Sequence, residues 1–193
     1  MSTSTKTTVA EYDRMIERGE FEPVEQHHVE LIRGEICEMS PIYPPHEDAL
    51  DLLVEWSFAV CPGQGIRVRV QNSLGIPELE SVPQPDLAWV RRIDYRRVRP
   101  TVADLLLLVE VSDTSLRFDR GKKARLYAEA GVQDYWIANV KAEAIEVHRT
   151  PRDGVYIDVQ SFKGDQAISP LALPTAKLTA DQIWPQDVTD PLA

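Results

Sequence analysis

The sequence predicts a mixed α/β (α+β) fold, in which a mixed β-sheet is flanked by helices and preceded by an N-terminal helix and a β-hairpin. Two observations lead to this expectation. The hydrophobic pattern changes several times between helical spacing and strict alternation. The uninterrupted run LLLLVEV is typical of a strand covered on both faces. Because the chain has no internal repeat and no Gly/Ser linker, these segments are expected to share one folded unit.

The N-terminal part predicts a helix and then a hairpin. Thr8 and Glu11 have the spacing of a capping box, and the helix that they begin is expected to end at Gly19. The segments HVELI and EICEM, which begin at His28, are strand-like, and the turn residues Arg33 and Gly34 join them.

The remaining elements follow from the same rules. A proline-rich loop precedes a second helix, expected from Asp48 to Val60. A half-buried strand at 66–70 and a strand beginning at Asp86 come next, followed by the apolar run. A third helix is expected from Asp119 to Ala130, with Gly131 at its end, then the strands DYWIAN, AIEVHR and VYIDVQ and a tail that wraps the domain.

Length and charge limit the function classes. The chain has 193 residues, which suits one domain over 1–193, with a core at about 28–140 and C-terminal strands and tail at 141–193. Asp and Glu number 31 against 21 Lys and Arg, so the formal net charge is −10. A surface that is basic all over is excluded, and a nucleic acid could bind only at a local basic patch.

The cysteines and the apolar runs indicate the cellular compartment of the protein. Cys37 and Cys61 form neither a disulfide framework nor a four-ligand zinc site, and the opening MSTSTKTT lacks the apolar stretch of a signal peptide. The longest apolar run, from Leu105 to Val109, is far shorter than the roughly 20 residues that a membrane-spanning helix needs. We expect a cytoplasmic protein outside the membrane.

Glu110 is the most informative residue of the chain. It interrupts the apolar run LLLLVEVS, where an ionised carboxylate needs an ion pair or a bound cation. A salt bridge to one of the many arginines is one explanation. Asp86 favours the other, because it opens a strand that we expect to lie beside that of Glu110, and for Asp86 itself turn capping is the alternative.

Two neighbouring carboxylates indicate a divalent cation, because they repel each other unless a cation lies between them. Mg²⁺ accepts such oxygens together with a main-chain carbonyl and waters, so we expect Asp86, Glu110 and the carbonyl of Val111 to be its ligands, with Mn²⁺ as an alternative ion.

The helix RFDRGKKARLYAEAG brings a positive charge toward these acids. Lys123 lies at helical spacing from Leu126, Tyr127 and Ala130, on the side that faces the core. A lysine beside the carboxylates could orient or deprotonate an attacking water and offset the charge of a pentavalent phosphate. A lysine that extends along the helix into solvent is the alternative.

Four segments together resemble a known family. VELIRGEICEMSP, PQPDLAWV, LLLLVEVS and DRGKKARLYAEAGVQDYWIAN, in this order and spacing, resemble the Uma-type restriction endonuclease family, a branch of the PD-(D/E)XK nuclease superfamily. The match runs from about His28 to Asn139. The resemblance implies a restriction-endonuclease-like core and Mg²⁺-dependent cleavage of DNA phosphodiester bonds.

The resemblance also implies roles for individual residues. Asp86 matches the aspartate that follows a proline, and Glu110 matches the acid of the central strand. The superfamily's lysine two residues beyond that acid is Ser112 here, so Lys123 is expected to replace it from the following helix. Glu30 matches the glutamate of the first hairpin and could complete the acidic cluster; the alternative is a solvent-facing strand residue.

A histidine and two basic patches are candidates for contact with DNA. His46 matches a histidine before the second helix and could contact a phosphate, although a histidine at a helix start is commonly a surface residue. The basic patches are expected to flank the acids, and pairing with surplus acidic residues is the alternative for about half of them. They comprise Arg91, Arg92, Arg96, Arg97 and Arg99 in the link between the acid-bearing strands, and Arg117, Arg120, Lys122, Lys123 and Arg125 on the next helix.

The sequence therefore leads to one main hypothesis and two rivals. The main hypothesis is a Mg²⁺-dependent endonuclease in which water attacks a DNA phosphorus. The first rival is a catalytically inactive nuclease-like domain that binds nucleic acid or a partner protein. The second is a structural or interaction protein whose Glu110 only pairs with an arginine. A homodimer is also expected, with YWIANV or the C-terminal tail as candidate interfaces.

Overall fold

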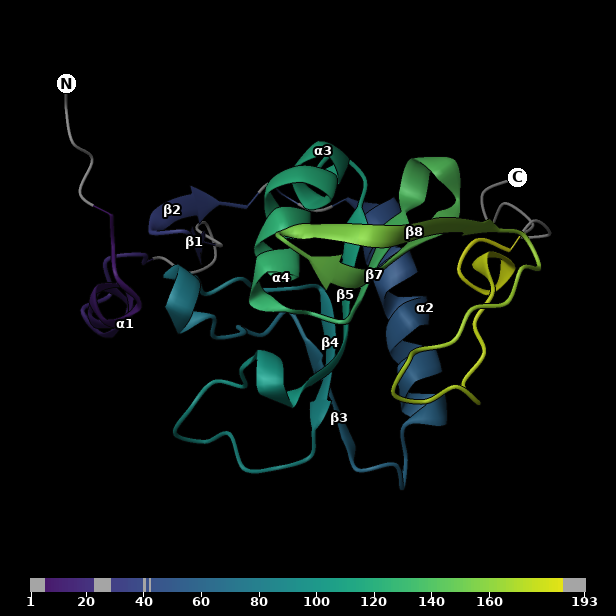
Figure 1. Ribbon diagram of the computed structural model, residues 1–193, viewed down its shortest axis with the longest axis horizontal. Coiled ribbons are helices and arrows are strands. Elements are labelled where there is room, and N and C mark those ends of the chain that lie inside the picture. The colour runs from purple at the N-terminus through teal and green to yellow at the C-terminus, as the bar shows by residue number, and fades with distance from the viewer. Residues whose placement is uncertain (1–5, 23–28, 40, 42, 186–193) are drawn as a thin grey trace.

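A six-stranded mixed sheet forms the centre of the computed structural model, which describes residues 6–22, 29–39, 41 and 43–185 (Figure 1). The strand order is β3-β4-β5-β6-β7-β8. Only β5 and β6 are parallel among the neighbours in this sheet, which confirms the expected mixed sheet. The strands are β3 (Ile66–Val70), β4 (Leu87–Arg91), β5 (Leu105–Ser112), β6 (Asp134–Asn139), β7 (Ala144–Arg152) and β8 (Val155–Lys163).

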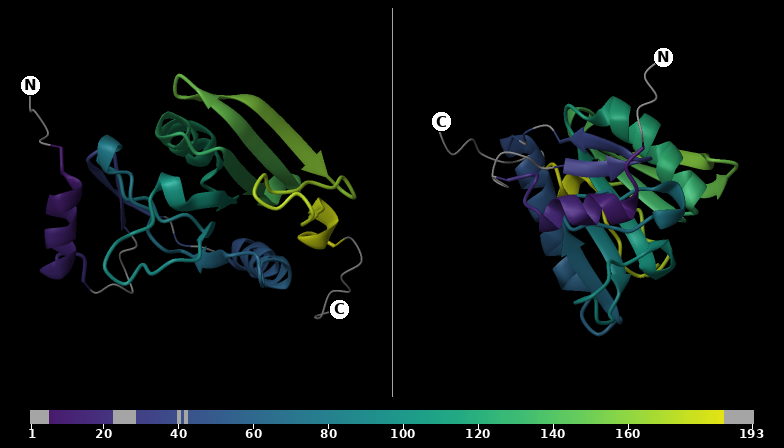
Figure 2. Two further views of the ribbon diagram at one scale, coloured as in Figure 1. Left: turned by 60° about the horizontal axis from the view of Figure 1, so that its bottom comes forward. Right: turned by 90° about the vertical axis from the view of Figure 1, so that its left-hand side faces the viewer.

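Helices cover both faces of this sheet, as the two views of Figure 2 show. The helix α2 (Pro44–Val60) packs on one face, where Trp56 stacks on Trp89 and Trp136. The other face is covered by α3 (Leu116–Phe118), a π-helical turn (Asp119–Lys123) and α4 (Ala124–Ala130).

Alternation along β5 decides which face Glu110 reaches. Leu107 and Val109 belong to the core beneath α2, whereas Leu108 belongs to the core beneath α4. Because side chains two residues apart share a face, Glu110 points toward α4 with Leu108.

The predicted hairpin is formed by β1 (Val29–Ile32) and β2 (Glu35–Glu38), which pair antiparallel. The turn residues Arg33 and Gly34 both have positive φ angles, 55° and 77°, as the tight turn of a hairpin requires. A Cβ on Gly34 would lie only 2.7 Å from the Cβ of Lys6, so glycine is needed here for space as well. His28, the first residue of the prediction, lies outside the described residues.

The N-terminal helix α1 (Val9–Glu17) packs against this hairpin. Thr8 forms the predicted capping box with Glu11. The hydroxyl of Tyr12 donates a hydrogen bond of 2.9 Å to the carbonyl of Val29, which ties α1 to β1.

Two helix predictions need correction. The second helix begins at Pro44 and not at Asp48, because a proline is tolerated in the first turn, where its missing N–H costs no hydrogen bond. The third helical segment begins at Leu116, three residues earlier than expected, and contains a π-helical turn that periodicity did not indicate.

The expected interface residues are also placed differently. The strand β6 (Asp134–Asn139), which contains most of YWIANV, is buried along its whole length, so that segment offers no exposed apolar surface. Exposed apolar side chains alternate instead along the edge strand β8, at Val155, Ile157 and Val159.

The tail after β8 returns to α2, and Figure 1 shows it in yellow beside that helix. Ile168, Leu178 and Ile183 are buried in the core beneath α2, and the indole of Trp56 donates to the carbonyl of Lys177 at 3.0 Å.

Two further sequence expectations concern the whole chain. The single domain at 1–193 includes terminal residues outside the described ranges and stays a prediction. Across residues 6–22, 29–39, 41 and 43–185, no helix has both the length and the apolar character needed to cross a bilayer.

Candidate active site

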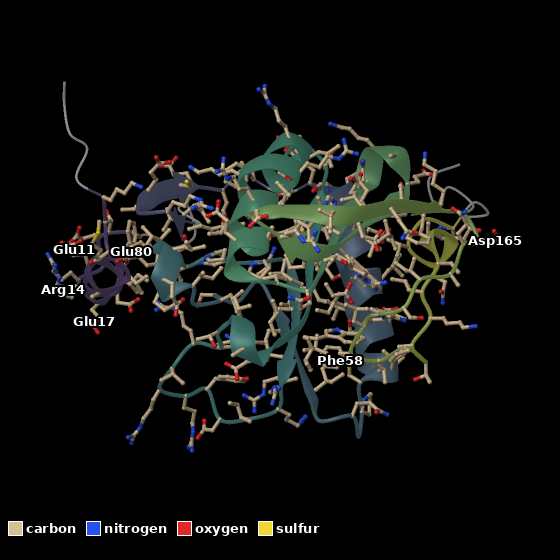
Figure 3. All side chains as sticks on the ribbon, in the orientation of Figure 1. Glu11, Arg14, Glu17, Phe58, Glu80 and Asp165 are labelled. Atoms are coloured by element: carbon tan, nitrogen blue, oxygen red, sulfur yellow. The ribbon has the colours of Figure 1, made fainter. Side chains whose placement is uncertain are left out.

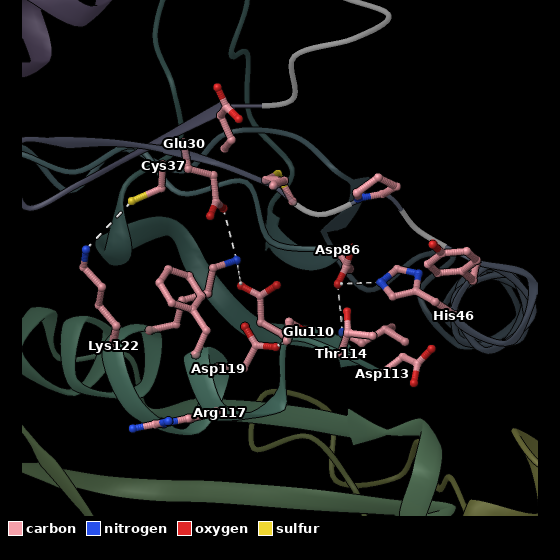
Figure 4. A pocket seen from close by; sticks show the side chains of 18 residues that line it. Glu30, Cys37, His46, Asp86, Glu110, Asp113, Thr114, Arg117, Asp119 and Lys122 are labelled. Atoms are coloured by element: carbon pink, nitrogen blue, oxygen red, sulfur yellow. Dashed lines mark hydrogen bonds and ion pairs between the residues drawn. The ribbon is translucent and has the colours of Figure 1, made fainter.

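The predicted acidic residues line a pocket of about 550 Å³ (Figure 4). It lies at the C-terminal end of β5, between the β1–β2 hairpin, the N-terminus of α2 and the α3 segment. Of the site residues predicted from the sequence, those that line it are Glu30, His46, Asp86, Glu110, Val111, Arg117 and Lys123.

Glu110 is buried and has two donors on the same oxygen. Lys123 Nζ lies 3.0 Å from its Oε1, and the hydroxyl of Tyr127 donates to that oxygen at 2.7 Å. Among the described residues, none donates to Oε2. The expected partner of Glu110 therefore exists, but it is a lysine with a tyrosine and not an arginine, and one carboxylate oxygen remains for a ligand.

Asp86 stands beside Glu110 because β4 and β5 are neighbours. Their last pair is Leu87 with Val109, and Asp86 is one residue further along. Its Oδ2 accepts a hydrogen bond of 2.8 Å from the backbone amide of Val111, and its Oδ1 accepts one of 3.3 Å from Gln71. Asp86 thus bonds to neighbouring strands and does not cap its own turn. The amide of Val111 is used in this contact, and the carbonyl of Val111 as a metal ligand stays a prediction.

His46 belongs to the same group. Its Nε2 lies 3.4 Å from Asp86 Oδ2, and the residue is buried in the first turn of α2. The alternative of an ordinary surface histidine is wrong, because α2 begins early enough to direct this turn into the pocket. Its Nδ1 is buried and has no hydrogen-bond partner among the described residues.

Lys123 and Glu30 complete the part of the site that the sequence anticipated. Lys123 is only 3% exposed, and its Nζ lies 3.1 Å from Glu30 Oε1. Glu30 is buried as well and also accepts a hydrogen bond of 2.6 Å from the amide of Gln84. Both solvent-exposed alternatives are wrong, since the hairpin covers the helix that carries Lys123.

Sequence reasoning missed Asp119 as a site residue. It is buried at the start of the π-helical turn, and its Oδ2 accepts hydrogen bonds from Ser112 at 2.7 Å and Ser115 at 2.5 Å. Its spacing of four residues from Lys123 was a signal that could have found it. Ser112, two residues beyond Glu110, thus holds Asp119.

The carboxyl groups of this cluster strongly influence one another. Burial raises the pKa of Glu110 well above its usual range, and the neighbouring carboxylates raise it further against the opposing charge of Lys123. Burial likewise raises the pKa of Asp119. For Asp86 the effect of burial is outweighed, because the hydrogen bond and charge of His46 and the amide of Val111 lower its pKa.

For the positive groups, burial acts on the pKa in the opposite direction. Burial alone would lower the pKa of Lys123, but the surrounding carboxylates raise it, so the ammonium form is favoured. Burial also disfavours charge on His46, yet Asp86 raises its pKa. When Glu30, Asp86, Glu110 and Asp119 are ionised, the negative charges around Lys123 outnumber its single positive charge.

This set of residues fits a divalent cation. The donors are carboxylate oxygens in charge excess, and Glu110 Oε2 has no protein donor among the described residues. Within the described residues, no three His, Cys, Asp or Glu side chains converge as a ready-made metal cage. Mg²⁺ does not require one, because it is commonly held by one or two carboxylates together with waters and substrate phosphates.

One of the two basic patches is not at the site. The link that contains Arg91 and Arg92 leaves the far end of β4, where Val90 pairs with Leu105 at the start of β5. Glu110 is five residues further along β5, which is about 17 Å at the rise of a strand. The expectation that these arginines flank the acids is wrong. Because β4 and β5 are antiparallel, the link between them begins and ends at the ends of these strands that are far from the acids.

The second patch is at the site, but its members differ. Arg117 and Lys122 line the pocket. Arg120 is turned away, and its guanidinium forms two hydrogen bonds to Glu146 of β7, at 2.7 and 2.6 Å.

Comparisons with known proteins identify the family of the chain. A family model described as "Uma2: Putative restriction endonuclease" matches residues 9–181. No curated protein sequence matches the chain. The fold is similar to the crystal structure of a "putative nuclease belonging to DUF820" from Anabaena variabilis, with a TM-score of 0.71 and 14% sequence identity over 92% of this chain and 97% of that chain. Since the family model covers most of the sequence, including every acid of the pocket, the chain belongs to the Uma2 family of nuclease-like proteins.

Proposed function

We propose that the protein is a Mg²⁺-dependent endonuclease that hydrolyses DNA phosphodiester bonds in this pocket. The observation that carries the proposal is that four buried carboxyl groups, those of Glu30, Asp86, Glu110 and Asp119, line one pocket with the buried Lys123, which contacts two of them. A purely structural ion pair would need one acid for one lysine. The family and the shared fold support a nuclease.

The ligands that we propose for the cation are Asp86, Glu110 and the carbonyl of Val111, with Mn²⁺ as an alternative ion. Such an ion supplies charge stabilisation at a phosphoryl oxygen. Glu30 anchors Lys123 from the side of the hairpin, and Asp119 adds negative charge from the helical side.

Lys123 is the residue that we propose to act on the reacting atoms. Its ammonium is held between Glu30 and Glu110, which fixes its position without solvent. From there it donates to the attacking water or to an equatorial phosphoryl oxygen and offsets the developing negative charge. His46, Arg117 and Arg120 are proposed to contact the DNA backbone, Arg120 only after its guanidinium leaves Glu146. Arg91 and Arg92 could meet only a distant part of a long DNA.

The deciding experiment replaces each acid by its neutral isostere. Asp86→Asn and Glu110→Gln are expected to abolish Mg²⁺-dependent cleavage of labelled DNA, while circular dichroism shows an intact fold because repulsion within the cluster is relieved. Asp165→Asn, an exposed acid outside the pocket, is the control and should cut as the unmodified protein does. Cleavage at the unmodified rate by either pocket variant would refute the assignment.

A domain that binds nucleic acid or a protein without cutting remains the alternative. The missing lysine after Glu110 favours it, whereas the ammonium of Lys123, 3.0 Å from Glu110 Oε1, supports the enzyme. Titration calorimetry with Mg²⁺ separates the two, because an inactive domain should show no heat that depends on Asp86.

The assembly and the cellular location are proposed as well. We place the protein in the cytoplasm and propose a homodimer that uses the exposed β8 residues Val155, Ile157 and Val159. Sedimentation velocity is the measurement for the dimer, and a monomer at micromolar concentration would argue against it.

A further inference from the structure

The mouth of the pocket has a different chemistry from its buried lining. That lining is acidic, whereas Tyr43, which is exposed, and Met39 and Phe118, which are half-buried, add apolar surface where the pocket meets solvent. Tyr43 is 58% exposed, and among the described residues no other ring packs against it. An exposed aromatic ring at the mouth of a polar pocket is a platform on which a nucleobase can stack.

Positive charge lies close to the second aromatic ring of the mouth. The Nζ atoms of Lys122 and Lys123 are each 6.0 Å from the ring centroid of Phe118. Arg117 lines the same wall. Lys122 is paired with Glu35, so this side of the mouth offers a phosphate backbone Arg117 and, once that pair opens, Lys122, beside aromatic surface for bases.

The exposed side of the helix that leads away from Tyr43 is acidic. Tyr43 is the N-cap of α2, and Glu47, Asp51 and Glu55 follow it at intervals of four residues, so each lies one turn further along the helix and the three form an acidic row. All three are exposed, and within the described residues none of them forms an ion pair. From Glu47 to Glu55 the row is about 12 Å long at the rise of an α-helix.

A duplex and a single strand meet this mouth differently. A duplex keeps its bases stacked inside and carries two phosphate backbones, at about one charge per 1.7 Å of axis. With one backbone on Arg117 and Lys122, the acidic row repels the other backbone wherever it approaches within about one Debye length, roughly 8–10 Å. A single strand carries one backbone, and its bases are free to stack on Tyr43.

We infer that the pocket selects single-stranded DNA, with a base stacked on Tyr43 and the backbone on the side of Arg117 and Lys122. The inference rests on the proposed nuclease function and adds its substrate class. The acidic row of α2, defined as Glu47, Asp51 and Glu55, is the element that disfavours a duplex.

The first test measures binding without a metal ion. Fluorescence anisotropy in EDTA compares a labelled single strand with the duplex of the same sequence, and the single strand should bind more tightly. Tyr43→Ala should weaken single-strand binding about 5- to 100-fold, the range for loss of one stacked base. Tyr43→Phe should keep the affinity.

Phe58 supplies the matched control for Tyr43. It lies on α2, which Tyr43 caps, is 61% exposed and does not line the pocket; Figure 3 labels it. Phe58→Ala should leave single-strand binding unchanged. Equal affinities of Tyr43→Ala and Phe58→Ala, or a duplex that binds as tightly as the single strand, would overturn the inference.

The second test changes the charge of the acidic row. Glu47→Lys with Asp51→Lys should raise duplex affinity more than single-strand affinity. The control pair Glu17→Lys with Asp165→Lys makes the same change of net charge at exposed positions away from the mouth, both labelled in Figure 3. An equal gain for both pairs would show that only net charge matters and would refute a role for the row.

Cleavage assays with Mg²⁺ or Mn²⁺ separate the two proposals. Binding of single strands that depends on Tyr43, without cleavage of any DNA, would keep this inference and refute the nuclease. Cleavage of duplexes faster than single strands, unchanged by Tyr43→Ala, would keep the nuclease and refute this inference.

Discussion

Tyr127 and Lys123 both donate to one oxygen of Glu110, and at the residue scale this double contact fixes the direction of the buried carboxylate. The position of the other oxygen, Oε2, is thereby fixed before any ligand binds. A buried carboxylate that keeps one oxygen free of protein donors is costly for folding, so its donors carry an unusual share of stability.

Tyr127→Phe removes one hydroxyl and so tests the contribution of this donor to stability. The variant removes one of the two donors to the buried Glu110 Oε1, and the free energy of unfolding should fall by about 1–3 kcal/mol. Tyr12→Phe is the matched control, because its hydroxyl donates to a neutral carbonyl, that of Val29, and should cost about 0.5–1.5 kcal/mol. Urea denaturation of both variants gives the comparison. A larger loss of stability for Tyr12→Phe would contradict the large contribution that we expect from the donors to Glu110.

Glu146 predicts an acid-dependent change in stability. Burial alone would raise its pKa, but contacts with His148, Arg120 and Asn139 outweigh burial and lower it to about 2. A lowered folded-state pKa adds stability above the unfolded-state value, and this stability is lost as the pH falls toward the folded-state value. The loss should therefore occur between about pH 5 and pH 2 and amount to about 2 kcal/mol. In Glu146→Gln this part of the pH dependence should vanish, as measured by urea denaturation across that range. An unchanged slope would exclude Glu146 as its source.

At the scale of elements, the π-helical turn links the site to the sheet. It spans Asp119–Lys123, so its first and last residues are both in the pocket, while Arg120 between them is held by Glu146 on β7. A π-helical turn widens the helix locally and is frequent at functional sites. We interpret the ion pair between Arg120 and Glu146 as the contact that sets the orientation of this turn against β7.

Arg120→Ala should accordingly lower the free energy of unfolding by about 1–3 kcal/mol, because it leaves the buried Glu146 without its main partner. Arg125→Ala is the control on the adjoining helix, where the exposed pair with Glu129 should be worth less than about 1 kcal/mol. Thermal and urea denaturation measure both. Loss of DNA affinity in Arg120→Ala with unchanged stability would instead favour the direct DNA contact expected from the sequence.

At the scale of the whole molecule, the tail belongs to the core beneath α2. Leu178 is buried there with Ile168, and the two residues exchange backbone hydrogen bonds of 2.8 and 2.9 Å. The tail therefore supports α2, and α2 in turn carries His46 and Tyr43 at the pocket.

Leu178→Ala should cost about 2–5 kcal/mol, the usual range for a leucine removed from a packed core. Leu171→Ala in the same tail is the control and should have little effect, since Leu171 is exposed. Equal effects on the urea midpoint would mean that the tail does not contribute to the core.

Three features can be predicted from the amino-acid sequence alone: the alternating and apolar patterns that build the sheet, the capping box of α1, and the need for a partner of Glu110. These are local properties, because periodicity and the cost of a buried charge act within a few residues. Three others depend on the folded chain: Arg91 and Arg92 lie at the end of β4 that is far from the pocket, His46 is buried, and Asp119 joins the acids. Those outcomes depend on strand direction, on the first residue of α2 and on one π-helical turn, and no periodicity in the chain records any of them.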